Sequence, residues 1–178
     1  NPPKMRTVEI MDTTLRDGEQ TSGVSFSTSE KLTLAKLLLE ELGVDRIEIA
    51  SARVSKGELH AVQGITEWAQ NNQLLHRVEV LTFLDEGKSL EWMQTAGAKV
   101  QNLLTKGSLN HLTHQLKQKP SDHFKKIEES VYAAQSQYVN SNLYLEDWSN
   151  GMRNSKDYVF DYVGCVQTIK LKRNMLPD

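Results

Sequence analysis

The chain has 178 residues, of which 38% are hydrophobic and 25% charged, and its formal net charge is −2. This composition suits a globular domain with one apolar core, and it gives no general electrostatic reason to expect a nucleic-acid partner. No apolar run reaches 18 residues and no signal-peptide pattern opens the chain, so neither a membrane span nor secretion is expected. Cys165 is the only cysteine, which excludes an internal disulfide and favours a reducing, cytoplasmic setting.

The first distinctive stretch is an apolar run followed directly by crowded charge. Residues 1–7 are interpreted as a leader, and Val8–Met11 as a short strand. The sequence then reads Asp12-Thr13-Thr14-Leu15-Arg16-Asp17-Gly18-Glu19-Gln20. Because α/β folds keep their sites at the C-terminal ends of strands, these polar groups are expected to form a site. Arg16 and Asp17 suit a carboxylate substrate and a divalent metal, and the plainer alternative is an exposed ion pair.

Helices and strands are then expected to alternate along the chain. Ser27 and Glu30 fit a capping box that begins the first helix, and Gly43 ends it. Further strands are expected at residues 46–50, 77–84, 99–104, 142–146 and 171–176. Further helices are expected at residues 58–71, 89–95, 123–137 and 156–168. An alternation of about 25 to 30 residues is typical of βα units around a parallel sheet.

The strand count leaves two parallel folds open. Six strands are expected, whereas a TIM barrel of the (β/α)8 type needs eight and typically has about 250 residues. Periodicity alone fits a barrel truncated after about six strands and a flavodoxin-like open sheet equally well. A six-stranded piece of a barrel would leave two open edges, so we expect it to be weakly stable alone.

Three stretches carry a resemblance to a known family, and the first of them favours the barrel over the open sheet. The string from Asp12 to Gln20 resembles the signature that opens the DRE-TIM metallolyase superfamily, particularly its 2-isopropylmalate, homocitrate and citramalate synthases. The block Tyr144-Leu145-Glu146-Asp147-Trp148-Ser149-Asn150-Gly151 is similar to a fifth-strand motif of citramalate synthases. The tripeptide Leu176-Pro177-Asp178 is similar to the start of the sixth-strand motif. The resemblance implies that residues 1–178 are the amino-terminal part of one HMGL-like TIM-barrel catalytic domain. Whether the chain is a fragment or an incomplete sequence stays open.

The resemblance also implies an activity. It indicates an acyltransferase that joins acetyl-CoA to a 2-oxo acid in a metal-dependent Claisen-type condensation, with pyruvate as the favoured substrate and (R)-citramalate as the product. A 2-isopropylmalate synthase that acts on 2-oxoisovalerate is the close alternative, and a lyase is a more distant one. A noncatalytic fragment that only packs with a partner chain is the alternative from another class. A homodimer is expected by resemblance, and the metal stays open among Mg, Mn and Zn.

The resemblance assigns roles to eight residues. Asp17 is expected to bind the metal and Arg16 to stabilise developing oxyanion charge, while Gln20 and Glu146 position substrate or water. Glu48 either lines the floor of the site or is a structural acid that burial forces to be paired. The expected side-chain pocket, whose apolar wall suits a methyl group, consists of Leu81, Leu104 and Tyr144. Thr82 and Asn102 are weaker candidates.

Other groups fit the expected chemistry less well. The metal-binding His-x-His pair of the seventh strand in this superfamily is absent, so the 178-residue piece alone is expected to be inactive. His111 and His114 have a spacing that suits a metal, but we expect a surface role for them. The segment Lys106-Gly107-Ser108 either meets coenzyme phosphates or forms a turn.

Overall fold

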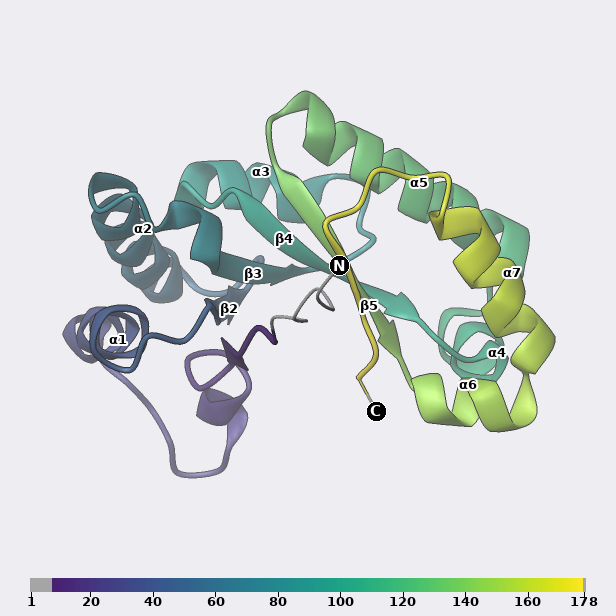
Figure 1. Cartoon of the computed structure of the whole chain (residues 1–178), viewed down its shortest axis with the longest axis horizontal. Coiled ribbons are helices and arrows are strands. Elements are labelled where there is room, and N and C mark those ends of the chain that lie inside the picture. Colours follow the sequence, from purple (N-terminus) through teal and green to yellow (C-terminus); the bar gives the residue numbers. More distant parts are fainter. Residues whose placement is uncertain (1–7, 178) are drawn as a thin grey trace, which may run out of the picture.

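The computed structural model describes residues 8–177 as a curved sheet of six parallel strands with helices between them (Figure 1). The strands are β1 (Met11–Asp12), β2 (Arg46–Ser51), β3 (Val78–Thr82), β4 (Val100–Lys106), β5 (Asn140–Glu146) and β6 (Arg173–Met175). They pair in sequence order from β1 to β6. A doubly wound sheet reverses its strand order at a switch point, so the flavodoxin-like alternative is wrong and the fold is a truncated (β/α)8 barrel.

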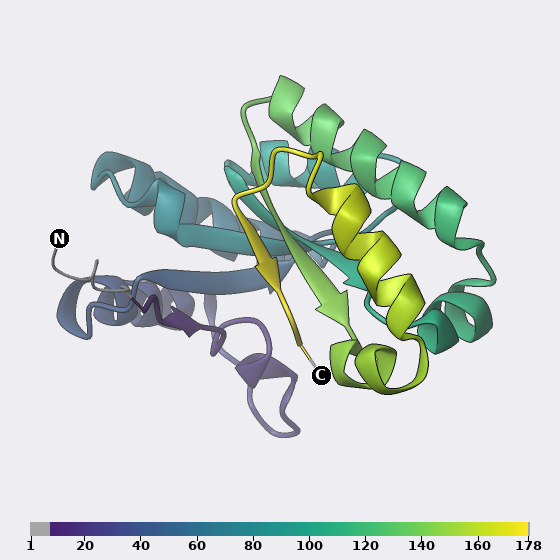
Figure 2. The same cartoon turned by 45° about the vertical axis from the view of Figure 1, so that its right-hand side comes forward.

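The helices connect each strand to the next and cover the outside of this half-barrel (Figures 1 and 2). They are α1 (Thr28–Lys36), α2 (Lys56–Asn71), α3 (Lys88–Ala96), α4 (Leu109–His111), α5 (Pro120–Ser136), α6 (Trp148–Asn154) and α7 (Lys156–Val166). Two helices continue as π-helical turns, over Leu37–Glu41 after α1 and over Leu112–Leu116 after α4. Within residues 8–177, no helix is both long and apolar enough to cross a membrane.

The capping box predicted for the first helix is confirmed. The Ser27 hydroxyl accepts a hydrogen bond from the backbone N–H of Glu30, and the Glu30 carboxylate accepts one from the N–H of Ser27 at 2.7 Å. Both contacts satisfy backbone donors that the first turn of a helix leaves free. Gly43 follows the π-helical turn with φ of +72°, a left-handed conformation that glycine adopts without strain. The sequence therefore specifies both ends of this helical segment locally.

The apolar core lies between the sheet and its helices. Successive strand side chains point to opposite faces, and the outward ones are mostly apolar. One buried cluster includes Ile49 of β2 and Ile65 of α2, and a second includes Leu143 of β5 and Tyr162 of α7. The inward side chains of the same strands are largely polar or charged, as at Glu48, which is fully buried. The concave face of the half-barrel therefore carries the polar groups.

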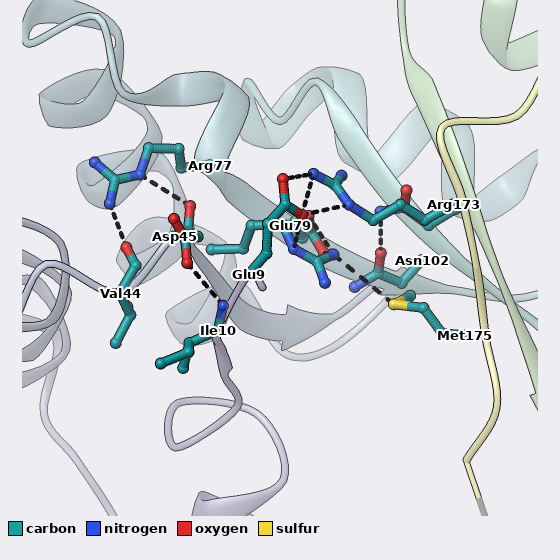
Figure 3. A network of polar contacts seen from close by, with 11 residues as sticks. Glu9, Ile10, Val44, Asp45, Arg77, Glu79, Asn102, Arg173 and Met175 are labelled. Carbon is teal, nitrogen blue, oxygen red and sulfur yellow. Dashed lines mark hydrogen bonds and ion pairs between the residues drawn. The ribbon is translucent and has the colours of Figure 1, made fainter. Parts of the chain in front are cut away.

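At the N-terminal ends of the strands, these polar groups form an ion-pair network (Figure 3). Arg173 of β6 makes two hydrogen bonds of 2.8 and 2.9 Å to the carboxylate of Glu9, which precedes β1. Arg46 of β2 contacts Glu9 at 3.5 Å and buried Glu79 of β3 at 3.1 Å. These contacts join the first strand to the last across the concave face.

Some expected elements differ from the structure. The first strand is shorter than predicted, because Val8 and Ile10 lie outside β1 and are 86% and 61% exposed. Ile10 still pairs with the next segment through its backbone, since its C=O accepts hydrogen bonds from Asp45 and Arg46. As an edge strand, β1 has only one neighbour among the described residues, which leaves these apolar side chains uncovered. The sequence did not predict α4 or α6, and the predicted leader lies outside the described residues.

Candidate active site

The segment that follows β1 folds into a tight turn at the C-terminal end of the strands. The C=O of Thr13 accepts hydrogen bonds from three successive backbone N–H groups, those of residues 16 to 18, at 2.8 to 3.1 Å. The Asp12 carboxylate fixes the start of the turn by accepting from the Thr14 N–H at 2.9 Å. Leu15 is 1% exposed and anchors the turn in the core. Figure 2 shows this turn at the same end of the half-barrel as α6, which follows β5.

The turn directs Arg16 into the half-barrel and leaves Asp17 near its open face. Arg16 Nε donates to Glu48 Oε1 at 2.6 Å, and its Nη1 donates to Asp17 Oδ1 at 3.0 Å. The Arg16 side chain is 17% exposed, the Asp17 side chain is 62% exposed, and that of Glu48 is fully buried. Burial lowers the pKa of Arg16, but the charge and hydrogen bond of Glu48, together with the charge of Asp17, outweigh burial and raise the pKa. Arg16 is therefore a fixed cation with an exposed carboxylate beside it.

Glu48 is the centre of a buried polar chain that runs across three strands. Asn102 of β4 donates its side-chain amide to Glu48 Oε2, and Asn142 of β5 donates to Asn102 Oδ1 at 2.8 Å. Both oxygens of the Glu48 carboxylate are thus bonded to protein groups. Burial raises the pKa of Glu48, although the hydrogen bond from Asn102 and the charge of Arg16 oppose the rise. The pairing that the buried position of Glu48 requires is confirmed, and Asn102, a weaker candidate from sequence, is part of it.

The three predicted pocket residues lie on adjacent strands of the concave face. Leu104 pairs with Tyr144 in the β4–β5 ladder, and Leu81 pairs with Asn102 one strand away. Leu81 and Tyr144 are each 7% exposed, and Leu104 is partly buried. Burial, followed by the charge of Glu48, raises the pKa of Tyr144 well above its usual value, so the phenol stays neutral. Together these side chains form a largely apolar wall next to the Arg16–Glu48 pair.

The remaining predicted residues lie at the rim. Glu146 ends β5, and its Oε2 forms an ion pair with the ammonium group of Lys106 at the end of β4. Gln20 is exposed and, with Arg16, lines a small cavity of about 150 Å³ between the turn and the start of α2. No hydrogen bond within residues 8–177 joins Gln20 to Glu146. Thr82 faces the other side of the sheet, where it donates to Gln101.

Two features of the site were not predicted from sequence. Glu19 turns away from the site to Lys31, which is 2% exposed and also pairs with Glu58 of α2. These two ion pairs connect the turn to α1 and α2 on the side away from the site. The second feature is the side chain of Lys106, which is bonded to Glu146 and to Gln115. Its contact with Glu146 is set by the pairing of β4 with β5, which local sequence does not show.

Metal binding can be tested against the donors present. Asp17 offers one accessible hard oxygen ligand of the kind that divalent cations take. Across residues 8–177, however, no group of three or more His, Cys, Asp or Glu side chains converges as a metal site. His111 instead lies 3.4 Å from Asp147 Oδ2. Among the described residues, Asp17 therefore fits as a single ligand of a divalent cation.

A parallel half-barrel with charged groups at the C-terminal strand ends has the layout of a barrel enzyme. A model of the HMGL-like family matches residues 7–178, and the chain belongs to this family. Among solved structures, the HMG-CoA lyase of Bacillus subtilis superposes with a TM-score of 0.74 at 18% identity, covering 99% of this chain and 59% of that one. The HMG-CoA lyase of Pseudomonas aeruginosa gives 0.72 at 19% identity. These likenesses confirm the truncated barrel fold.

Curated relatives are synthases of two kinds. The chain is 33% identical over 145 residues to a 2-isopropylmalate synthase of Halalkalibacterium halodurans, which covers 82% of this chain and 28% of that protein. It is 51% identical over 74 residues to the (R)-citramalate synthase of Methanocaldococcus jannaschii, which covers 42% of this chain and 15% of that protein. The chain thus spans less than a third of either relative.

Proposed function

We propose that the protein carrying this chain joins acetyl-CoA to a 2-oxo acid, and that pyruvate is its substrate and (R)-citramalate its product. The observation that carries this proposal is the fixed Arg16 with exposed Asp17 beside it, next to the wall of Leu81, Leu104 and Tyr144. The family match and the synthases among the relatives support the reaction class. The choice of pyruvate rests on the wall, since bulky side chains leave room for a methyl group more readily than for an isopropyl group.

In this reaction the acetyl methyl group loses a proton, and its carbon forms a bond to the ketone carbon of the oxo acid. The ketone oxygen gains a proton, and water then cleaves the thioester to release coenzyme A. Arg16 stabilises the negative charge that develops on the ketone oxygen, because its free N–H donors lie at the inner end of the turn. Glu146 orients the reacting groups through the oxygen that Lys106 leaves free. Glu48 acts through Arg16 rather than on the substrate, since both of its oxygens are bonded to protein groups.

A divalent metal bound at Asp17 would chelate the oxo acid and polarise its carbonyl group. Its identity stays open among Mg, Mn and Zn. Gln20 is proposed to contact substrate or ordered water from the exposed side of the turn. We also infer that residues 1–178 are the amino-terminal part of one barrel domain, and that the protein is a homodimer. The barrel inference is supported by the extra length of the superposed HMG-CoA lyase chains, and the homodimer by resemblance alone.

The test is a thiol-release assay on the full-length protein with acetyl-CoA, a divalent metal and each 2-oxo acid in turn. We expect release of coenzyme A with pyruvate, and a loss of more than about a hundredfold in Asp17→Asn, because even outer partners of a metal site cost 10 to 100-fold. Asp161→Asn is the matched control, since Asp161 is exposed on α7, away from the strand ends. Release only with 2-oxoisovalerate would contradict the pocket argument, and no release with any oxo acid would reject the synthase proposal.

A further inference from the structure

The last pair of the β4–β5 ladder places Lys106 directly opposite Glu146. The ammonium group of Lys106 pairs with Glu146 Oε2 and donates to Gln115 Oε1 at 3.0 Å. We propose that Lys106 is a positioning residue that holds the Glu146 carboxylate for the condensation. This inference rests on the role assigned to Glu146 in the proposed function, and it assigns a residue that the sequence associated only with coenzyme phosphates or a turn.

The backbone of Lys106 is fixed from two helices. Its N–H donates to Nε2 of buried His123 of α5 at 3.2 Å, and its C=O accepts from the Tyr158 hydroxyl of α7 at 2.6 Å. Neither backbone group is free to move without losing a hydrogen bond, which for a buried polar group is costly. These backbone hydrogen bonds therefore fix the position from which the Lys106 side chain extends.

The next residue closes the two strand ends together. The N–H of Gly107 donates to the C=O of Glu146 at 2.6 Å. A side chain at position 107 would place its Cβ 2.7 Å from the C=O oxygen of Leu145, so only glycine allows this approach. Lys106 and Glu146 are thus held at neighbouring points of one rigid unit, and their ion pair follows from that placement.

The exposed fractions of the two side chains show that Glu146, rather than Lys106, is accessible to substrate. The Lys106 side chain is 12% exposed, whereas that of Glu146 is 36% exposed. Glu146 Oε1 has no hydrogen-bond partner among residues 8–177, while Oε2 is taken by Lys106. A coenzyme phosphate would have to detach Lys106 from Glu146 and Gln115. The arrangement therefore suits a lysine that orients a carboxylate better than one that binds a phosphate.

The test compares Lys106→Met with Lys106→Arg in the full-length protein. We expect Lys106→Met to lower kcat by about ten to a hundredfold, with KM for acetyl-CoA changed by less than about twofold, because a misplaced catalytic group costs up to 10²-fold. Lys106→Arg keeps the charge and is expected to recover most of the rate. In a Glu146→Gln background, Lys106→Met should add less than about twofold, since two residues that act as one unit are not additive.

The controls separate the possible failures. Lys99→Met removes an exposed lysine just before the other end of β4 and should leave kcat unchanged. Gln115→Leu removes the second partner of Lys106 without touching the buried core, and we expect it to lower kcat by about two to fivefold. This variant tests the proposal even if Lys106→Met folds poorly. If Glu146→Gln is fully active, the role of Glu146 in the proposed function fails. Two results would overturn the positioning role of Lys106 and leave that of Glu146 intact, provided that Glu146→Gln is impaired. In the first, Lys106→Met multiplies the loss of kcat caused by Glu146→Gln. In the second, Lys106→Met raises only KM for acetyl-CoA.

Discussion

Replacing Glu48 by glutamine tests whether the buried polar chain stabilises the half-barrel. The substitution keeps the shape of the side chain but removes its charge. Glu48 accepts hydrogen bonds from Arg16 Nε and from the Asn102 amide, and its side chain is fully buried. A glutamine has one acceptor oxygen and one donor nitrogen, so its NH₂ group must face one of these two donors.

The expected loss of stability follows from these contacts. A hydrogen bond to a charged group contributes roughly 1.5–3 kcal/mol, and a buried donor left without an acceptor costs about 1–3 kcal/mol. Relief of the desolvation of the buried carboxylate offsets part of this. We expect a net loss of about 3 kcal/mol in the free energy of unfolding, a large part of the 5–15 kcal/mol typical of a domain.

Urea unfolding followed by tryptophan fluorescence measures this loss. With a slope of about 2 kcal/mol per molar urea, a loss of about 3 kcal/mol moves the midpoint down by about 1.5 M. Glu67→Gln on the exposed face of α2 is the control, and its unfolding free energy should stay within about 0.5 kcal/mol of wild type. A midpoint for Glu48→Gln that equals the control, with an unchanged slope, would refute the reasoning.

Two further predictions concern His123 and Gly151. Burial, reinforced by the charges of Lys106 and Lys126, lowers the pKa of His123 to about 4. The unfolded state alone binds the proton between about pH 6.5 and 4, so the unfolding free energy should fall by up to about 3 kcal/mol as pH drops through that window. Denaturant titrations should show a flatter slope with pH for His123→Gln but not for His60→Gln on the surface, and equal slopes would contradict the assignment. At Gly151, an added Cβ would lie 2.0 Å from the C=O oxygen of Gly107, so Gly151→Ala should lower the melting temperature through a loss of about 3 kcal/mol. Gly64→Ala in α2, where space is open, should instead stabilise by about 0.5–1 kcal/mol, and a Gly151→Ala variant as stable as this control would refute the close approach.

Most of the fold could be predicted from sequence because the signals for individual helices and strands lie within short stretches of the chain. The capping box at Ser27 specifies the start of its own helix, and the apolar residues that recur in β2 to β5 mark those strands. Helix α6 was missed because Asn150 and Gly151 are poor helix formers. The reason for a glycine at that position is its contact with Gly107, which lies 44 positions earlier and becomes a neighbour only through strand pairing.

The residues of the candidate site also divide into those that have a local sequence signal and those whose contacts depend on distant parts of the chain. Arg16 and Asp17 were found through a contiguous motif, and Glu48 through the cost of burying a carboxylate between two isoleucines. The contact of Lys106 with Glu146 is not predictable from sequence, because the register that places the two residues opposite each other cannot be read from either strand alone. Lys31 was missed because a lysine in the first turns of a helix is usually exposed.

The ion pair between Glu9 and Arg173 has a consequence for the kinetics of folding. Its members are 164 residues apart, and between them lie the five strands from β1 to β5. A contact with so large a loop to close forms only after the intervening strands have docked, so it stabilises the native state more than the transition state. Such a contact acts mainly by slowing unfolding and has little effect on how fast the chain folds. The ion-pair network at the N-terminal ends of the strands thus contributes to the lifetime of the curved sheet once the sheet has formed.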